Sequence, residues 1–162
     1  MTIALFGNNY PEYFSKYIQH LIKRLENEHV KIIMEQNLFN FIKDKVRFQK
    51  QPNIFTNHQE LITLEADFLF SIGGDGTLLN AVTYVRDSNI PILGINTGRL
   101  GFISSIAADQ IEKAITDIIK ENFKIGMAEP LSKNIIISIM TGYGTGFETE
   151  IIDFDYKNFS PN

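Results

Sequence analysis

Several residue types and patterns are missing from this sequence, and each absence excludes a class of structure. There is no cysteine, which rules out disulfides and cysteine-based metal sites and agrees with a reducing cytoplasm. No apolar run approaches the roughly 20 residues that a membrane span requires. The amino terminus has neither a basic leader nor a cleavage site of small residues. We therefore expect a soluble cytoplasmic protein without a membrane partner.

Positive charge is neither abundant nor clustered. The sequence has 15 Lys and Arg residues against 19 Asp and Glu residues, a formal net charge of -4. A nucleic-acid surface requires a basic patch or stripe, and the scattered basic residues form none. Nucleic acid is therefore not expected as a partner.

Apolar segments alternate with helical patterns over the first 126 residues. Four runs have the length and composition of buried strands: 3–6, 30–34, 67–72 and 92–95. Apolar residues recur at helical spacing over 14–25, 38–46, 77–85 and 111–119, the last with a predicted capping box of Asp109 and Glu112. Strands that are apolar on both faces and alternate with helices predict a doubly wound α/β domain with a parallel sheet over residues 1–126.

The pattern changes after Gly126. Residues 135–140 and 147–154 have the character of strands on either side of the glycine-rich segment 141–146, and no helix is evident. We predict a short β-hairpin there. Residues 127–162 are interpreted as a β-rich tail, an incomplete second domain.

A glycine cluster lies where the third apolar run ends and a helix is predicted to begin at Thr77. Phosphate-binding loops need inward-pointing backbone N–H groups, and glycine permits both the unusual backbone angles and the close approach of a ligand. Gly73, Gly74 and Gly76 supply these properties. The helix that follows adds the positive end of its dipole, and Thr77 could cap it or donate to a phosphate oxygen.

The carboxylate of Asp75 is the unexpected member of this cluster. Two unit charges about 4 Å apart interact by about 4 kcal/mol at an effective dielectric constant of 20, so a bare carboxylate would repel a phosphate. A divalent cation would reverse that repulsion, or the carboxylate could accept a proton from an attacking hydroxyl. The structural alternative is a tight Asp-Gly turn with a capping aspartate.

Two common phosphate-binding motifs are excluded by the order of residues in this cluster. It is not the dinucleotide fingerprint G-x-G-x-x-G, and it lacks the Gly-Lys-Ser/Thr ending of a P-loop. A hydride-transfer dehydrogenase and a P-loop NTPase therefore both lose support. The sequence also predicts no protein ligands for a metal, since its three histidines lie on or beside predicted helices without a partner motif.

The segment Gly73–Thr77 resembles a signature shared by NAD kinases, diacylglycerol and sphingoid-base kinases, and phosphofructokinases. Residues 78–81 and the segment Ile90–Phe102 narrow this to the NAD kinase family, which they resemble both in sequence and in the distance between the two loops. The resemblance implies a fold of NAD kinase/diacylglycerol kinase-like type. It also implies ATP-dependent phosphorylation of the adenosine ribose 2′-hydroxyl of NAD, giving NADP, with a divalent cation such as Mg²⁺.

The same resemblance assigns roles to individual residues. Asp75 corresponds to the catalytic aspartate that accepts the proton of the 2′-hydroxyl, and Gly76 to the adjacent glycine that contacts the nucleotide. Leu79 and Phe102 correspond to apolar positions that flank adenine, although Phe102 could equally be a core residue.

Two polar residues of the second loop are further candidates for binding the nucleotide. Asn96 could tie the loop together or reach a ribose hydroxyl, and its alternative is an ordinary turn residue. Arg99 could donate to a phosphate in a bidentate manner, and its alternative is a surface arginine.

Part of the family pattern has no counterpart in this sequence. NAD kinases carry an Asn-Glu or Asn-Asp pair for the ribose and a Thr-Pro-Thr-Gly-Ser-like loop, and beyond about Glu129 the resemblance ends. We expect a chain too short for the whole enzyme, by truncation, internal deletion or frameshift.

Three functions remain open. The first is an NAD kinase completed by another chain of a homo-oligomer, which the family forms. The second is a non-catalytic nucleotide-binding or interaction module. The third is a lipid kinase of the diacylglycerol kinase type, which shares the Gly73–Thr77 signature but not the Asn96–Phe102 loop.

Overall fold

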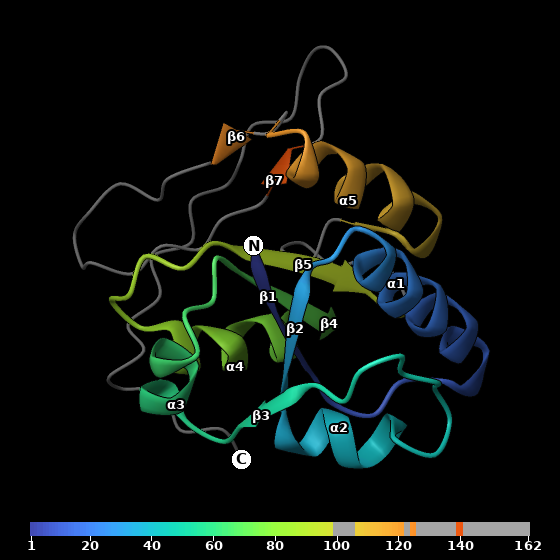
Figure 1. The fold of residues 1–162 in the computed structure, drawn as a ribbon, viewed down its shortest axis with the longest axis horizontal. Helices are drawn as coiled ribbons and strands as arrows, with labels where there is room; N and C mark the ends of the chain where they lie inside the picture. Colours follow the sequence, from blue (N-terminus) through green and yellow to red (C-terminus); the bar gives the residue numbers. More distant parts are fainter. Residues whose placement is uncertain (99–105, 122–123, 126–138, 141–162) are drawn as a thin grey trace.

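The computed structural model describes residues 1–98, 106–121, 124–125 and 139–140. Its centre is a five-stranded sheet in the order β3-β2-β1-β4-β5, and all neighbouring strands are parallel. The strands are β1 (Thr2–Gly7), β2 (Lys31–Glu35), β3 (Asn53–Phe55), β4 (Phe68–Gly73) and β5 (Ile92–Asn96). This architecture confirms the predicted doubly wound α/β fold (Figure 1).

Helices connect the strands and cover both faces of the sheet. In chain order they are η1 (Glu12–Phe14), α1 (Ser15–Asn27), α2 (Gln36–Ile42), α3 (His58–Thr63), α4 (Asp75–Val85), η2 (Ala108–Gln110) and α5 (Ile111–Ile119). Among the described residues, no helix combines the length and the apolar character needed to cross a membrane.

Each face of the sheet carries its own apolar cluster, because successive side chains of a strand point to opposite faces. Along β4, Phe68, Phe70 and Ile72 join a cluster with residues of α1, α2 and α5. Leu69 points the other way and packs with residues of α3 and α4. Figure 1 shows α1 and α4 on opposite sides of the strands. A sheet buried on both faces explains why its strands are almost continuously apolar.

In the five-stranded sheet and the helices that cover it, two elements were not predicted from the sequence, β3 and α3. They are three and six residues long, too short for a periodicity to stand out from the background. The predicted helix over 38–46 is also too long, because α2 ends at Ile42. The backbone turns there, with the N–H groups of Lys45 and Val46 both donating to the Ile42 carbonyl at 2.8 and 3.0 Å.

The predicted capping box of Asp109 and Glu112 is wrong. The chain enters η2 and α5 with the backbone N–H of Ala107 donating to the Gln110 side chain at 3.3 Å. Glu112 instead accepts from Arg24 Nε at 3.2 Å and contacts His20, so its carboxylate links α5 to α1. Local spacing assigned Glu112 to a helix cap, but in the structure Glu112 forms a long-range ion pair with Arg24.

A second, two-stranded sheet follows α5. It pairs β6 (Lys124–Ile125) with β7 (Ile139–Met140) in antiparallel fashion. The predicted strand at 147–154 and the segment 141–146 lie outside the described residues. The predicted division into residues 1–126 and 127–162 stays a prediction, and the β6–β7 sheet joins residues from both sides of it.

Candidate functional site

The order of the strands predicts a ligand-binding crevice at the carboxyl ends of the strands. From β1 the chain proceeds through α1 to β2 on one side, whereas β4 and β5 lie on the other side of β1. The point where the order reverses therefore lies between β1 and β4. In open α/β sheets, ligands bind in the crevice outside the carboxyl ends of the strands at such a point. Gly7, Gly73 and Asn96 end the three strands concerned, with Gly7 beside Ile72 and Gly73 beside Asn96.

The glycine cluster enters its helix earlier than the sequence predicted. Helix α4 begins at Asp75 and not at Thr77, and Gly74 is its N-cap residue. The carbonyl of Gly74 accepts from the N–H groups of Thr77 and Leu78 at 3.0 and 3.1 Å. Asp75, Gly76 and Thr77 therefore form the first turn of α4. Backbone N–H groups of a first turn have no intrahelical acceptor and favour an anion.

Thr77 does not cap the helix, in contrast to one of its two predicted roles. It is the third helical residue, and the N-cap position belongs to Gly74, which has no side chain. A Cβ added to Gly73 would lie only 2.3 Å from Thr77 Oγ1 and 2.6 Å from Thr77 Cβ. The Thr77 side chain thus covers Gly73, which has φ 157°. The role of Thr77 as a donor to phosphate stays a prediction.

Glycine is needed for different reasons at the three positions of the cluster. Gly73 is required by the polypeptide itself, because any side chain there would collide with Thr77. At Gly74 and Gly76 an added Cβ would meet no atom within 4 Å, and both residues are exposed. Their positions are open space at the mouth of the crevice. A ligand approaching the backbone would use that space.

Asp75 and Leu79 share the outer face of α4. They are four residues apart and both partly exposed, whereas Leu78, Ala81 and Val82 are buried against the sheet. The Asp75 carboxylate lies in the first helical turn, near the positive end of the helix dipole. An apolar side chain thus lies one turn from a carboxylate, and both are partly exposed.

Asn96 anchors the loop that leaves β5. Its side chain is 4% exposed, and its Oδ1 accepts from the backbone N–H of Gly98 at 2.7 Å. The N–H of Asn96 donates to the Ile106 carbonyl at 2.8 Å, which brings the far end of the loop back to β5. The bond to Gly98 spans two residues, as in an ordinary Asx turn, so it fits both the loop-tying role and the turn-residue alternative, and the contact of Asn96 with a ribose stays a prediction. Arg99 and Phe102 lie outside the described residues.

Tyr13 is a residue at this edge to which the sequence assigned no role. Its hydroxyl donates to the Thr97 carbonyl at 2.7 Å, although the two residues are 84 positions apart. Its side chain is nevertheless 60% exposed. The sequence offered one signal for Tyr13, an aromatic residue in the connection that follows the strand ending at Gly7.

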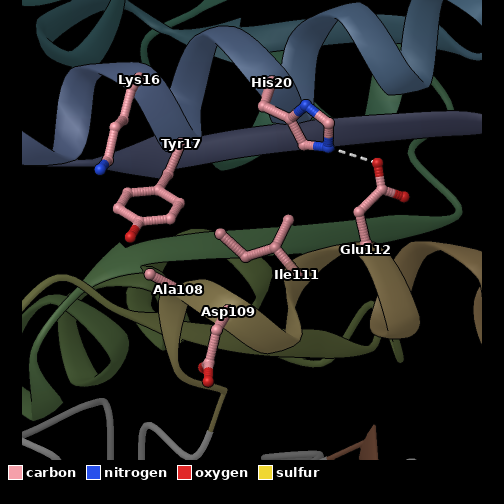
Figure 2. Close-up of a pocket in the computed structure, with 7 residues that line it drawn as sticks. All are labelled: Lys16, Tyr17, His20, Ala108, Asp109, Ile111 and Glu112. Atoms are coloured by element: carbon pink, nitrogen blue, oxygen red, sulfur yellow. Dashed lines mark hydrogen bonds and ion pairs between the residues drawn. The ribbon is translucent and has the colours of Figure 1, made fainter.

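A hollow elsewhere on the surface contains none of the candidate residues. It has a volume of about 340 Å³ and lies between α1 and the start of α5 (Figure 2). Lys16, Tyr17, Ala108, Asp109 and Ile111 line it together with the His20–Glu112 pair. Within the described ranges, no group of three or more His, Asp or Glu side chains could hold a metal ion.

Comparison with known proteins gives matches over most of the chain. Residues 3–123 match the family model described as the ATP-NAD kinase N-terminal domain. The NAD kinase of Christiangramia forsetii is 34% identical over 125 residues, which are 77% of this chain and 42% of the relative. That of Flavobacterium psychrophilum is 33% identical over 132 residues, 82% of this chain and 45% of the relative.

A solved structure has the same fold. The chain resembles the crystal structure of yeast NADH kinase complexed with NADH, with a TM-score of 0.64 and 19% identity, over 87% of this chain and 46% of that one. The chain thus spans less than half the length of these relatives.

Proposed function

Because the chain belongs to the NAD kinase family, we propose that it supplies the nucleotide-phosphate half of an ATP-dependent NAD kinase. The reaction transfers the γ-phosphoryl group of ATP to the adenosine ribose 2′-hydroxyl of NAD and gives NADP. The observation that carries the proposal is the first turn of α4, where a carboxylate stands beside two glycines with open space where side chains would be. Phosphoryl transfer depends chiefly on positioning and charge stabilisation, which such a turn provides.

Each residue of the first turn has a distinct task in this proposal. The backbone N–H groups of Gly74 and Gly76 contact phosphate oxygens, to which the missing side chains leave access. Asp75 accepts the proton of the 2′-hydroxyl as its oxygen attacks the γ-phosphorus and the bond to ADP breaks. Gly73 and Thr77 hold the turn in shape, and Leu79 offers an apolar contact to the adenine ring.

The second loop completes the binding surface. Asn96 fixes the start of this loop through its bond to Gly98 and places it beside Gly73. Arg99 and Phe102 follow in the sequence. We assign Phe102 the adenine contact implied by its family position, and Arg99 a phosphate contact for which its bidentate guanidinium is suited.

A divalent cation, Mg²⁺, would be held mainly by the phosphates of ATP. The carboxylate of Asp75 is the one protein ligand that we propose for it. The described residues offer no cluster of ligands that could hold it alone, and Mg²⁺ commonly binds through one or two carboxylates plus substrate phosphates. It would supply neutralisation of the phosphate charge. Asp75 then approaches the phosphates without the repulsion that a bare carboxylate would meet.

The ribose-holding pair and the second glycine loop of the family have no counterpart that we find in the 162 residues. We propose that the complete site needs these groups from polypeptide outside the 162 residues, because a second copy of the same residues in a homo-oligomer would lack them as well. Small-molecule nucleotides are then the ligands of this half, and the cytoplasm is the compartment that offers NAD and ATP.

The test is NADP formation by the purified chain with NAD, ATP and Mg²⁺, compared between the unaltered chain and Asp75→Asn. Removing a general base costs about 10²- to 10⁴-fold in kcat, so the variant should fall by that factor. Asp87→Asn is the matched control, because exposed Asp87 lies just beyond the opposite end of α4 and loses the same charge.

Equal loss in both variants, or none in Asp75→Asn, would contradict the role of Asp75. Nucleotide binding without turnover by a folded unaltered chain would indicate a non-catalytic binding module. Phosphorylation of diacylglycerol in place of NAD would indicate the lipid kinase.

A further inference from the structure

Tyr13 joins two loops that are distant in sequence. It lies in η1, which continues the connection from β1 to α1, and its hydroxyl donates to the carbonyl of Thr97, directly after β5. Thr97 itself is only 8% exposed, so the bond reaches a carbonyl at the buried root of the β5 loop.

The strand order gives this bond its significance. β4 lies between β1 and β5, so a link from the connection after β1 to the residue after β5 must pass the carboxyl end of β4. Neighbouring strands are about 4.8 Å apart, and β1 and β5 are therefore separated by about 10 Å. Gly73, where the glycine cluster begins, ends β4 beside Asn96. Tyr13 thus borders the crevice on the α1 side, and the first turn of α4 borders it on the other.

The ring of Tyr13 is exposed and yet held in place. Among the described residues, Met1 and Tyr13 are the large hydrophobic side chains that are clearly exposed, at 49% and 60%. One edge of the ring contacts Phe14, with centroids 6.5 Å apart and an interplanar angle of 73°. With the hydroxyl bonded at one end and Phe14 at the other, the ring has already lost most of its freedom, so a ligand that stacks on it loses little more entropy.

We propose that Tyr13 is a nucleotide-positioning residue, with its hydroxyl fixing the β5 loop relative to the β1 loop and its exposed ring contacting a planar base of the bound nucleotide. The contact between the ring and a base rests on the proposed function. A ring face suits a purine or nicotinamide because stacking accepts any planar base and tolerates solvent at the edges.

The role of the ring is tested by measuring the Kd of three ligands: NAD, ATP and inorganic pyrophosphate. Each is titrated into ¹⁵N-labelled chain while the NMR amide signals of Gly74, Gly76 and Gly98 are followed. Tyr13→Leu should weaken the binding of NAD, ATP or both about tenfold, as expected for loss of one stacking contact. Pyrophosphate has no base, and its Kd should not change. Comparison of NAD with ATP identifies the nucleotide whose base meets the ring.

The hydroxyl is tested in the free chain with Tyr13→Phe. Without the donor, the amide signal of Gly98, whose peptide includes the Thr97 carbonyl, should shift and its hydrogen exchange should accelerate. Tyr17→Phe is the matched control, since Tyr17 also packs against Phe14 but lines the hollow between α1 and the start of α5 (Figure 2). It should leave the Gly98 signal and all three affinities unchanged.

The two possible failures are distinguishable. Equal affinities in the unaltered chain and Tyr13→Leu would overturn the ring assignment and leave the proposed function standing. A folded unaltered chain that binds neither nucleotide would overturn the proposed function and the ring assignment together. An unchanged Gly98 signal in Tyr13→Phe would overturn the positioning assignment in either case.

Discussion

At the scale of single residues, two glycines of one short motif are present for opposite reasons. Gly73 has no room for a side chain, because Thr77 occupies the space that a Cβ would need. Gly76 has ample room and lies in the first turn of α4, where glycine is a poor helix former. The motif therefore combines a requirement of the fold with a feature that costs stability and suits a ligand.

Alanine at the two positions should have opposite effects on stability. Gly76→Ala should raise the free energy of unfolding by about 0.4 to 1 kcal/mol, because alanine reduces the entropy of the unfolded chain without meeting a neighbour. Gly73→Ala should lower it by about 1 to 3 kcal/mol, since the Cβ would collide with Thr77 at a φ of 157°. Urea denaturation of the ligand-free variants measures both values.

The same pair separates stability from binding. Under the proposed function, the stabilised Gly76→Ala variant should bind ATP more weakly, since its methyl group occupies the open space beside the backbone. Tighter or equal ATP binding by a more stable Gly76→Ala would show that this space is not used by a ligand.

At the scale of elements, α3 shows how a short helix is defined by its first turn. The side chain of Asn57 accepts from the N–H of Glu60 at 3.0 Å, and Glu60 accepts in return from the N–H of Thr56 at 2.7 Å and its hydroxyl at 3.0 Å. These bonds favour the ionised carboxylate and lower the pKa of Glu60. A six-residue helix has little else to fix its start.

The stabilising effect of Glu60 should disappear in acid. Because the folded-state pKa is lowered, the effect is complete above the unfolded-state pKa and is lost as the pH falls through the folded-state pKa. Glu60→Gln should therefore be less stable than the unaltered chain at neutral pH, and the difference should shrink toward acid. Urea midpoints measured across this range test it, with exposed Glu65→Gln at the other end of α3 as control. A difference that is constant with pH would contradict the assignment.

At the scale of the whole molecule, two apolar clusters stabilise the sheet, one on each face. Their members among the described residues fall between Ile3 and Ile119. α5 contributes Ile111, Ala114, Ile115 and Ile118 to the cluster that also contains α1. The β6–β7 pair belongs to a different sheet.

A chain ending at residue 126 should therefore keep a cooperative thermal transition. A chain ending at residue 110 should lose it, because α5 would leave the apolar surface of α1 and β5 exposed. Circular dichroism during heating compares the three lengths. Loss of cooperativity in the chain that ends at residue 126 would contradict this boundary and show that the tail contributes to the core.

The sequence by itself determined the fold class and the central motif. Buried strands, helical spacing and the glycine cluster are local patterns, and the switch between them already predicts a doubly wound sheet with a loop at a strand end. The short β3 and α3 were not predicted, because segments of three and six residues show too little periodicity. Local spacing also misassigned Glu112, whose carboxylate binds Arg24 across 88 residues.

Only the tertiary structure decided which ends of the strands meet and what borders the crevice. The order β3-β2-β1-β4-β5 brings Gly73 beside Asn96, and it lets Tyr13 reach Thr97 past the strand between them. It also decided that α4 begins at Asp75, so that the carboxylate lies in a helical turn and not in a loop. The strand order and the Tyr13–Thr97 bond depend on packing between distant segments, and the free energy of such contacts leaves no trace in the spacing of neighbouring residues.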